Sequence, residues 1–84
     1  MPIPAETEMR IVLIVARRFK QPAEAFDRHA RFREDLGADS LDLFELTCRL
    51  EEELGLVIPD HAISELRTLA DVMEYLKEAG RPAA

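Results

Sequence analysis

The sequence predicts an all-α fold: a small antiparallel four-helix bundle with a long loop after helix one and a short third helix. Of its 84 residues, 48% are hydrophobic and 33% charged, which is too apolar for a disordered segment. Three stretches place apolar residues at the spacing of one helix face. Because a chain of this length can enclose only one small core, we expect a single domain over residues 1–84, with its core at about 5–79.

The first helix is expected to begin near Pro4, since proline is tolerated in a first turn. Its apolar face follows the spacing i, i+3, i+4, i+7 at Val12, Val15, Ala16 and Phe19. The largely β-branched run at residues 11–15 also suits a strand, but length and flanking charges favour a helix. Pro22 disfavours helical geometry at the preceding residue and therefore closes the element.

Residues 21–38 show no sustained periodicity and are expected to form a long ordered loop. Its apolar anchors are Phe26, Phe32 and Leu36. A loop of this length in so small a domain tends to be functional.

The second helix is expected over Ser40–Leu54, with Asp39 as its N-cap and Gly55 as its end. Because each residue of a helix is rotated by about 100° from the one before it, five residues fall on one stripe that suits a core, namely Leu43, Leu46, Thr47, Leu50 and Leu54. A second stripe, here called the outer stripe, falls almost opposite and consists of Leu41, Phe44 and Cys48.

The outer stripe has two interpretations. A bundle that buried both faces of the helix would pack Phe44 and Cys48 under the long loop. A docking surface would instead use the stripe for apolar contact and the neighbouring carboxylates to attract a basic partner. The second is favoured, because two-sided burial is difficult with so small a core. The predicted docking residues are Leu41, Asp42, Phe44, Glu45, Cys48, Glu51 and Glu52. Arg49 is expected to pair with Glu45 and Glu53, each four residues away.

After the second helix, residues 60–66 suit at most a short third helix. Thr68 and Asp71 then resemble a capping box that opens the fourth helix. Gly80 and Pro82 are expected to end that helix. Its apolar positions repeat the helical spacing at Leu69, Val72, Met73 and Leu76.

Ser40 opens the second helix, where a serine is usually a capping residue. Because Asp39 already supplies the cap, the Ser40 hydroxyl is expected to be free at the positive end of the helix dipole. A phosphate ester on that oxygen would meet unpaired N–H groups. Catalysis by Ser40 is disfavoured, since no G-x-S-x-G pattern is present and nothing places His29 or His61 nearby. Both histidines are interpreted as surface or loop residues.

The formal net charge of −6 disfavours nucleic acid and anionic membrane surfaces as partners. The basic stretch Arg28–Arg33 is interpreted as a solvated loop, since no nucleic-acid-binding motif surrounds it. No apolar run approaches a membrane span and no secretory signal is evident, so a cytoplasmic protein is expected. The single cysteine, Cys48, cannot form an internal disulfide, and two histidines provide no zinc-ligand spacing, so no metal is expected.

The run from Asp35 to Asp42, DLGADSLD, resembles the attachment motif of acyl carrier proteins, in which the serine receives 4′-phosphopantetheine. The likeness covers about residues 32–76. Beyond the motif it continues through Glu45 and Leu46, LEEEL at 50–54, Ile58-Pro59-Asp60 and residues 69–76.

This resemblance implies that a phosphopantetheinyl transferase moves the arm from coenzyme A onto Ser40, and that Asp39 contributes to transferase recognition. The terminal thiol would carry acyl groups as thioesters between enzymes, which dock on the second helix through basic patches. The carrier itself would catalyse nothing, and a monomer is expected. The acyl pocket would be lined by Phe32, Leu50, Ile58, Ile63, Leu66 and Val72.

Several residues depart from the usual family pattern. Residues 20–22 are Lys-Gln-Pro where Gly-Val is common, Cys48 replaces a frequent methionine, and Phe44 is bulkier than the usual aliphatic residue. Arg49 is basic where a small residue is common, and Ile63 replaces a frequent alanine and would shrink the acyl pocket. These departures suggest a specialised carrier with a dedicated partner set, not the housekeeping fatty-acid carrier. The leading interpretation is a discrete acyl carrier for fatty-acid or polyketide-type chemistry. The alternatives are an aminoacyl or D-alanyl carrier and an unmodified helical interaction subunit.

Overall fold

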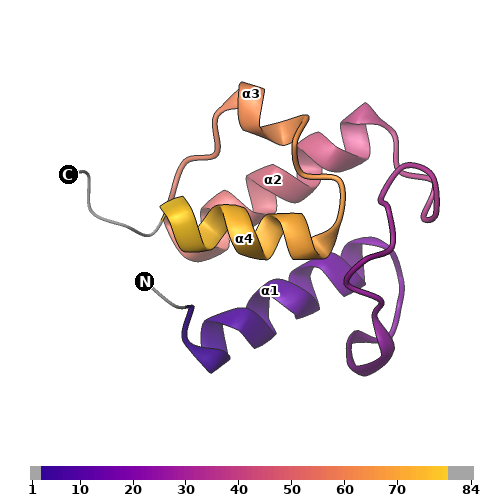
Figure 1. Cartoon of the computed structure of the whole chain (residues 1–84), viewed down its shortest axis with the longest axis horizontal. Helices are drawn as coiled ribbons and strands as arrows, with labels where there is room; N and C mark the ends of the chain where they lie inside the picture. The colour runs from indigo at the N-terminus through magenta and orange to yellow at the C-terminus, as the bar shows by residue number, and fades with distance from the viewer. Residues whose placement is uncertain (1–2, 80–84) are drawn as a thin grey trace.

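The computed structural model describes residues 3–79, and within this range it contains helices and no strand (Figure 1). The all-α prediction is therefore confirmed, and the strand considered at residues 11–15 is wrong. The helices are α1 at Ala5–Arg18, α2 at Ser40–Leu54, α3 at Asp60–Ile63 and α4 at Leu69–Ala79, with a 3-10 turn, η1, at Ala23–Ala25 in the long loop.

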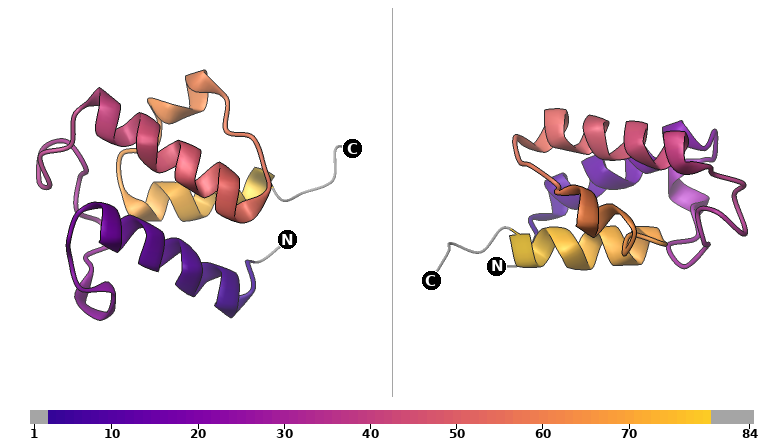
Figure 2. Two further views of the ribbon diagram at one scale, coloured as in Figure 1. Left: turned by 180° about the vertical axis from the view of Figure 1, so that it is seen from behind. Right: turned by 90° about the horizontal axis from the view of Figure 1, so that it is seen from above.

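The three long helices pack side by side, and α1 runs antiparallel to both α2 and α4 (Figures 1 and 2). The segment that contains α3 returns the chain along the bundle, so α2 and α4 run in the same direction. The long loop lies at the end of the bundle where α1 ends and both α2 and α4 begin. This topology places the start of α2 beside the loop.

The core is formed largely by the apolar faces that the helical spacing predicts, although the prediction for α1 missed Ile11. Ile11 and Val15 of α1, Leu50 of α2 and Leu69 of α4 are fully buried. Phe19 follows the end of α1 instead of lying within it, and its ring stacks on Phe32 with centroids 5.3 Å apart. The other strongly buried core residues include Val12, Leu43, Leu46, Ile58, Leu66, Val72, Met73 and Leu76.

The helix ends follow the local chemistry of the sequence. Pro4 lies at the N-cap of α1, one position before the helix, not in its first turn. Gly55 ends α2 in the left-handed conformation, with φ of 65°, which glycine adopts without a Cβ penalty. The capping box of α4 is present, because Asp71 N–H donates to Thr68 Oγ1 (3.1 Å) and Thr68 N–H donates to the Asp71 carboxylate (3.2 Å). The expected stop at Gly80 and Pro82 lies outside the described residues.

Lys20 also has a left-handed backbone, with φ of 55°. This conformation is uncommon for a residue with a side chain, and glycine adopts it without a steric cost. The helix ends at Arg18, four residues before Pro22, so the proline predicts that the element closes but not where it ends.

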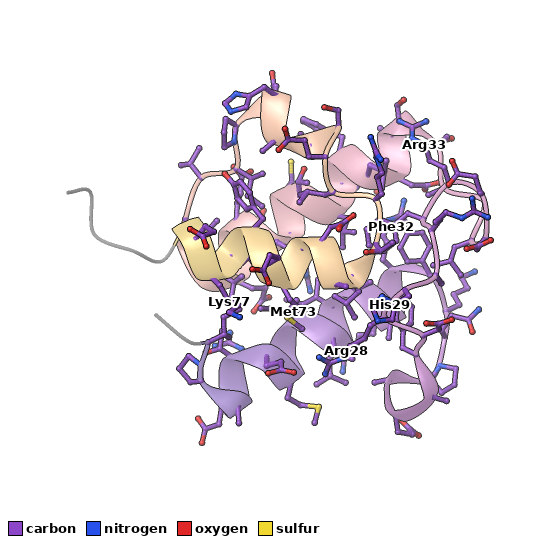
Figure 3. All side chains as sticks on the ribbon, in the orientation of Figure 1. Arg28, His29, Phe32, Arg33, Met73 and Lys77 are labelled. Atoms are coloured by element: carbon purple, nitrogen blue, oxygen red, sulfur yellow. The ribbon has the colours of Figure 1, made fainter. Side chains whose placement is uncertain are left out.

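The long loop is ordered by contacts that the sequence did not reveal. Phe32 N–H donates to the carbonyl of Arg67 (2.9 Å), and Ala70 N–H donates to the carbonyl of Arg28 (2.9 Å). The Arg28 guanidinium also pairs with Glu8 of α1 at 2.7 Å. Phe32 is 1% exposed and lies between the loop and the core (Figure 3). These contacts tie the loop to α1 and to the start of α4.

Two sets of ion pairs join α1 to α2, one at each end of the antiparallel pair. Arg10 pairs with Glu53 at 3.1 Å, and Arg18 pairs with Asp42 and with Glu45. The Arg10–Glu53 pair is exposed and contributes about 0–1 kcal/mol, whereas the Arg18–Asp42 pair is part-buried. Separately, none of the helices described over residues 3–79 has the length and apolar character that a bilayer crossing requires.

Candidate functional site

The start of α2 is capped by two carboxylates. Asp39, the N-cap residue, accepts the backbone N–H of Asp42 at 2.8 Å, and the Asp42 side chain accepts the backbone N–H of Asp39 at 3.0 Å. This reciprocal capping box satisfies two N–H groups that a helix start leaves unpaired. Ser40, the first helical residue, is therefore not needed as a cap, and its side chain is exposed.

The Ser40 hydroxyl is not free, contrary to the prediction, because Arg33 Nη2 donates to Ser40 Oγ at 3.1 Å. Arg33 comes from the loop just before α2 and lies beside the start of that helix (Figure 3). The stretch Arg28–Arg33 is thus more than a solvated loop, since it includes the buried Phe32 and the cation that contacts Ser40.

A phosphate ester fits this position. The Ser40 oxygen is exposed, lies on the first turn of a 15-residue helix, and already contacts a guanidinium, which is a strong partner for phosphate oxygens. His29 and His61 are both exposed, and Arg33 is the side chain that hydrogen-bonds Ser40. Within residues 3–79, no group of histidine, cysteine and acidic side chains could hold a metal ion. An exposed hydroxyl that contacts a guanidinium suits attachment of a phosphate-bearing group.

The capping box makes stability depend on pH. The backbone N–H of Asp42, which donates to the Asp39 carboxylate, lowers the pKa of Asp39 below its ordinary value of 3.8. A lowered pKa means that the folded state prefers the ionised carboxylate. Its stabilising contribution is therefore complete above the unfolded-state pKa of about 3.9 and is lost as the pH falls through the lower folded-state pKa.

We therefore expect acidification below about pH 4 to lower the urea midpoint of the wild type more than that of Asp39→Asn. Asparagine keeps the capping oxygen but does not titrate in this range, so it is a matched control. Urea unfolding followed by circular dichroism at a series of pH values measures the difference. Identical pH dependence of the two proteins would contradict the role of the Asp39 carboxylate.

The outer stripe is exposed to solvent. Leu41 is 62% exposed and Phe44 is 52% exposed, while Cys48 is partly buried. The interpretation in which the bundle buries this face under the long loop is therefore wrong. Exposed large apolar side chains grouped on one helix face are typical of interaction surfaces.

The acidic residues around the outer stripe differ in what they contact. Asp42 and Glu45 both pair with Arg18, and Glu51 accepts the backbone N–H of Ile58 at 2.7 Å. Glu52 has no hydrogen bond or ion pair within residues 3–79. Three of the four predicted docking carboxylates thus also hold the fold together, which leaves Glu52 as the carboxylate most available to a partner.

Arg49 makes half of its expected pairings. Its guanidinium lies 3.7 Å from Glu53, while Glu45 pairs with Arg18 instead. The expected contact between Arg49 and Glu45 is wrong, because a cation on the neighbouring helix competes for the same carboxylate.

An open groove of about 620 Å³ separates the outer faces of α1 and α2. Four of the predicted docking residues line it, namely Phe44, Glu45, Cys48 and Glu52. The opposite wall is formed by α1, whose Leu13 and Arg17 were missed by sequence reasoning. Leu13 is 38% exposed and lies outside the apolar face of α1, which is the signal that could have identified it.

A separate cavity of about 10 Å³ lies inside the bundle. Its lining is almost entirely apolar and includes five of the six residues predicted for the acyl pocket, which are Phe32, Leu50, Ile63, Leu66 and Val72. The sixth, Ile58, is buried in the core but does not line this cavity. Leu43, Leu46 and Thr47 complete the lining.

Comparison with known proteins supports the attachment motif. Residues 10–76 match the family model described as "Phosphopantetheine attachment site". The acyl carrier protein of Treponema pallidum (strain Nichols) is 39% identical over 72 residues, which cover 86% of this chain and 92% of the relative. The acyl carrier protein of Rickettsia canadensis (strain McKiel) is 38% identical over 71 residues, which cover 84% of this chain and 83% of the relative.

Proposed function

The chain belongs to the acyl carrier protein family, whose members carry a covalent 4′-phosphopantetheine, and we propose that it carries acyl thioesters on an arm attached to Ser40. The observation that supports this most directly is the exposed Ser40 hydroxyl on the first turn of α2, within the motif Asp35–Asp42. Members of this family are carriers and not catalysts.

Attachment requires a phosphopantetheinyl transferase and coenzyme A. The Ser40 Oγ–phosphorus bond forms, the pyrophosphate P–O bond of coenzyme A breaks, 3′,5′-ADP leaves, and the hydroxyl proton passes to a base of the transferase. The arm, when bound, supplies a terminal thiol that forms the thioester. Asp39 holds Ser40 at the helix start and is the residue through which we expect the transferase to recognise the motif.

The internal cavity favours an acyl group over an aminoacyl group. Its walls are apolar apart from Thr47, and a charged ammonium placed there would lose its hydration without gaining a counter-ion. An alkyl chain has no such cost, although a cavity of about 10 Å³ must expand to hold one. We therefore propose fatty-acid or polyketide-type chemistry, with an aminoacyl or D-alanyl carrier as the alternative.

The identity of the bound group distinguishes these alternatives. The protein is purified from its own cells, its thioesters are cleaved with hydroxylamine, and the released hydroxamate is identified by mass spectrometry. An aliphatic or ketide hydroxamate supports the proposal. Release of an amino-acid hydroxamate would favour the aminoacyl alternative.

We also propose that partner enzymes dock on the outer stripe of α2 through basic patches. Leu41 and Phe44 would supply apolar contact, and Glu52 would supply negative charge, since it makes no hydrogen bond or ion pair within residues 3–79. We expect the carrier to act as a cytoplasmic monomer, which leaves this face open to successive enzymes.

Association with a phosphopantetheinyl transferase should depend on salt. Raising the salt from about 0.1 M to about 1 M shortens the Debye length from about 10 Å to about 3 Å. If exposed carboxylates steer the encounter, the association rate should fall by roughly tenfold or more, while the dissociation rate changes less. Stopped-flow fluorescence over a salt series measures both rates.

Charge reversal locates the steering surface. Glu52→Lys should slow association more than Glu74→Lys, which makes the same change on α4, away from the outer stripe. Glu74 is a suitable control because its side chain is 71% exposed and its ion pair with Lys77 is long, at 3.9 Å. Equal effects of the two reversals, or a salt-independent association rate, would place docking elsewhere.

A further inference from the structure

Among the residues that the structure describes, Arg33 has no carboxylate partner. The two acidic residues that follow it, Glu34 and Asp35, both pair with Arg31, at 3.9 Å and 3.3 Å. Within residues 3–79, the polar contact of the Arg33 side chain is the Ser40 hydroxyl at 3.1 Å. A guanidinium has five N–H donors, so most of the donors of Arg33 are unused in this arrangement.

The chemistry at Ser40 changes when a phosphodiester replaces the hydroxyl. The ester oxygen stays in place, and the new anionic oxygens lie one bond further, within reach of the same guanidinium. The nearby carboxylates of Asp39 and Asp42 would otherwise make this end of α2 unfavourable for another negative charge. Arg33 is the cation that contacts the oxygen to be modified, since Arg18 contacts Asp42 instead.

We propose that Arg33 anchors the phosphate of the arm, by exchanging its hydrogen bond to the Ser40 hydroxyl for charge-assisted hydrogen bonds to the phosphodiester oxygens. This inference rests on the proposed attachment at Ser40. Arginine suits the role because its planar fork can donate two parallel hydrogen bonds to a phosphate. Arg33 would then hold the phosphate end of the arm in place while the rest of the arm moves.

The test compares apo and holo forms of the wild type, Arg33→Gln and Arg33→Lys. Arg67→Gln is the matched control, because it removes the same charge from an exposed side chain that has no hydrogen bond or ion pair within residues 3–79. Each protein is treated with coenzyme A and a transferase until mass spectrometry shows full modification. The melting temperature and the ³¹P chemical shift of the phosphodiester are then measured at low and high salt.

At low salt, modification should raise the melting temperature of the wild type by roughly 1–5 °C more than it raises that of Arg33→Gln. The wild-type ³¹P shift should change with salt, whereas that of Arg33→Gln should not, and Arg33→Lys should retain part of both effects. Arg67→Gln should resemble the wild type. If modification changes the melting temperature equally in the wild type and Arg33→Gln, and their ³¹P shifts depend on salt equally, the role of Arg33 is overturned but the carrier function is left intact. Failure to modify the wild type would overturn both.

Discussion

Replacing Ser40 with alanine is expected to abolish attachment of the arm completely. Incubation with coenzyme A and a broad-specificity transferase should increase the mass of the wild type by one phosphopantetheine group and leave Ser40→Ala unchanged. The effect is all-or-none because the alanine side chain has no oxygen to form the phosphoester. Asp39 and Asp42 cap α2 without using the Ser40 side chain, so the variant should fold normally.

Ser64 provides the matched control for this experiment. It is the other serine of the chain and is exposed at the end of α3, where its Oγ donates to the carbonyl of His61 at 3.1 Å. Ser64→Ala should be modified as readily as the wild type. Modification of Ser40→Ala, or its loss in Ser64→Ala, would contradict the assignment of the attachment site.

The second large effect concerns the two faces of α2. Leu50 is 0% exposed and contacts the centre of the core, so Leu50→Ala should lower the free energy of unfolding by about 2–5 kcal/mol. Phe44 is 52% exposed, so Phe44→Ala should change it by less than about 1 kcal/mol. Urea unfolding of the two variants, followed by circular dichroism, measures the contrast. Similar losses of stability would show that the outer stripe is part of the core.

In binding, the order of the two variants should reverse: Phe44→Ala should lose more affinity for a partner than Leu50→Ala. If Phe44 is a central contact for partners, Phe44→Ala should weaken binding to a transferase by about 5- to 30-fold, as truncation of a buried interface aromatic does. The measurement is made by titration calorimetry under conditions where both variants are folded. A Phe44→Ala variant that binds like the wild type would remove the outer stripe from the docking surface.

Local chemistry explains why the helices could be predicted so closely. The bounds of α2 agree with the prediction because Asp39 and Gly55 mark its two ends by their own capping preferences. Thr68 and Asp71 likewise form the predicted capping box of α4. The role of Asp42 in the α2 cap was missed, although its spacing of three residues from Asp39 is the signal for a capping box.

Contacts between distant elements could not be predicted in the same way. Helical periodicity identifies which face of α1 is apolar, but not that Arg18 at its end would pair with Asp42 and Glu45 of α2. The contact of Arg33 with Ser40 depends on how the loop folds back against the start of α2. That path is set by the buried Phe32 and by hydrogen bonds to the segment before α4. A single sequence without periodicity in this loop does not specify it.

The proposal that this chain is a phosphopantetheinylated carrier is tested most directly by the intact mass of the protein isolated from its own cells. We expect a mass above that of the polypeptide by one phosphopantetheine arm plus a further group, with hydroxylamine removing only the further group. Fragmentation should locate the arm on Ser40. Recovery of the unmodified polypeptide alone would contradict the account and favour a helical interaction subunit.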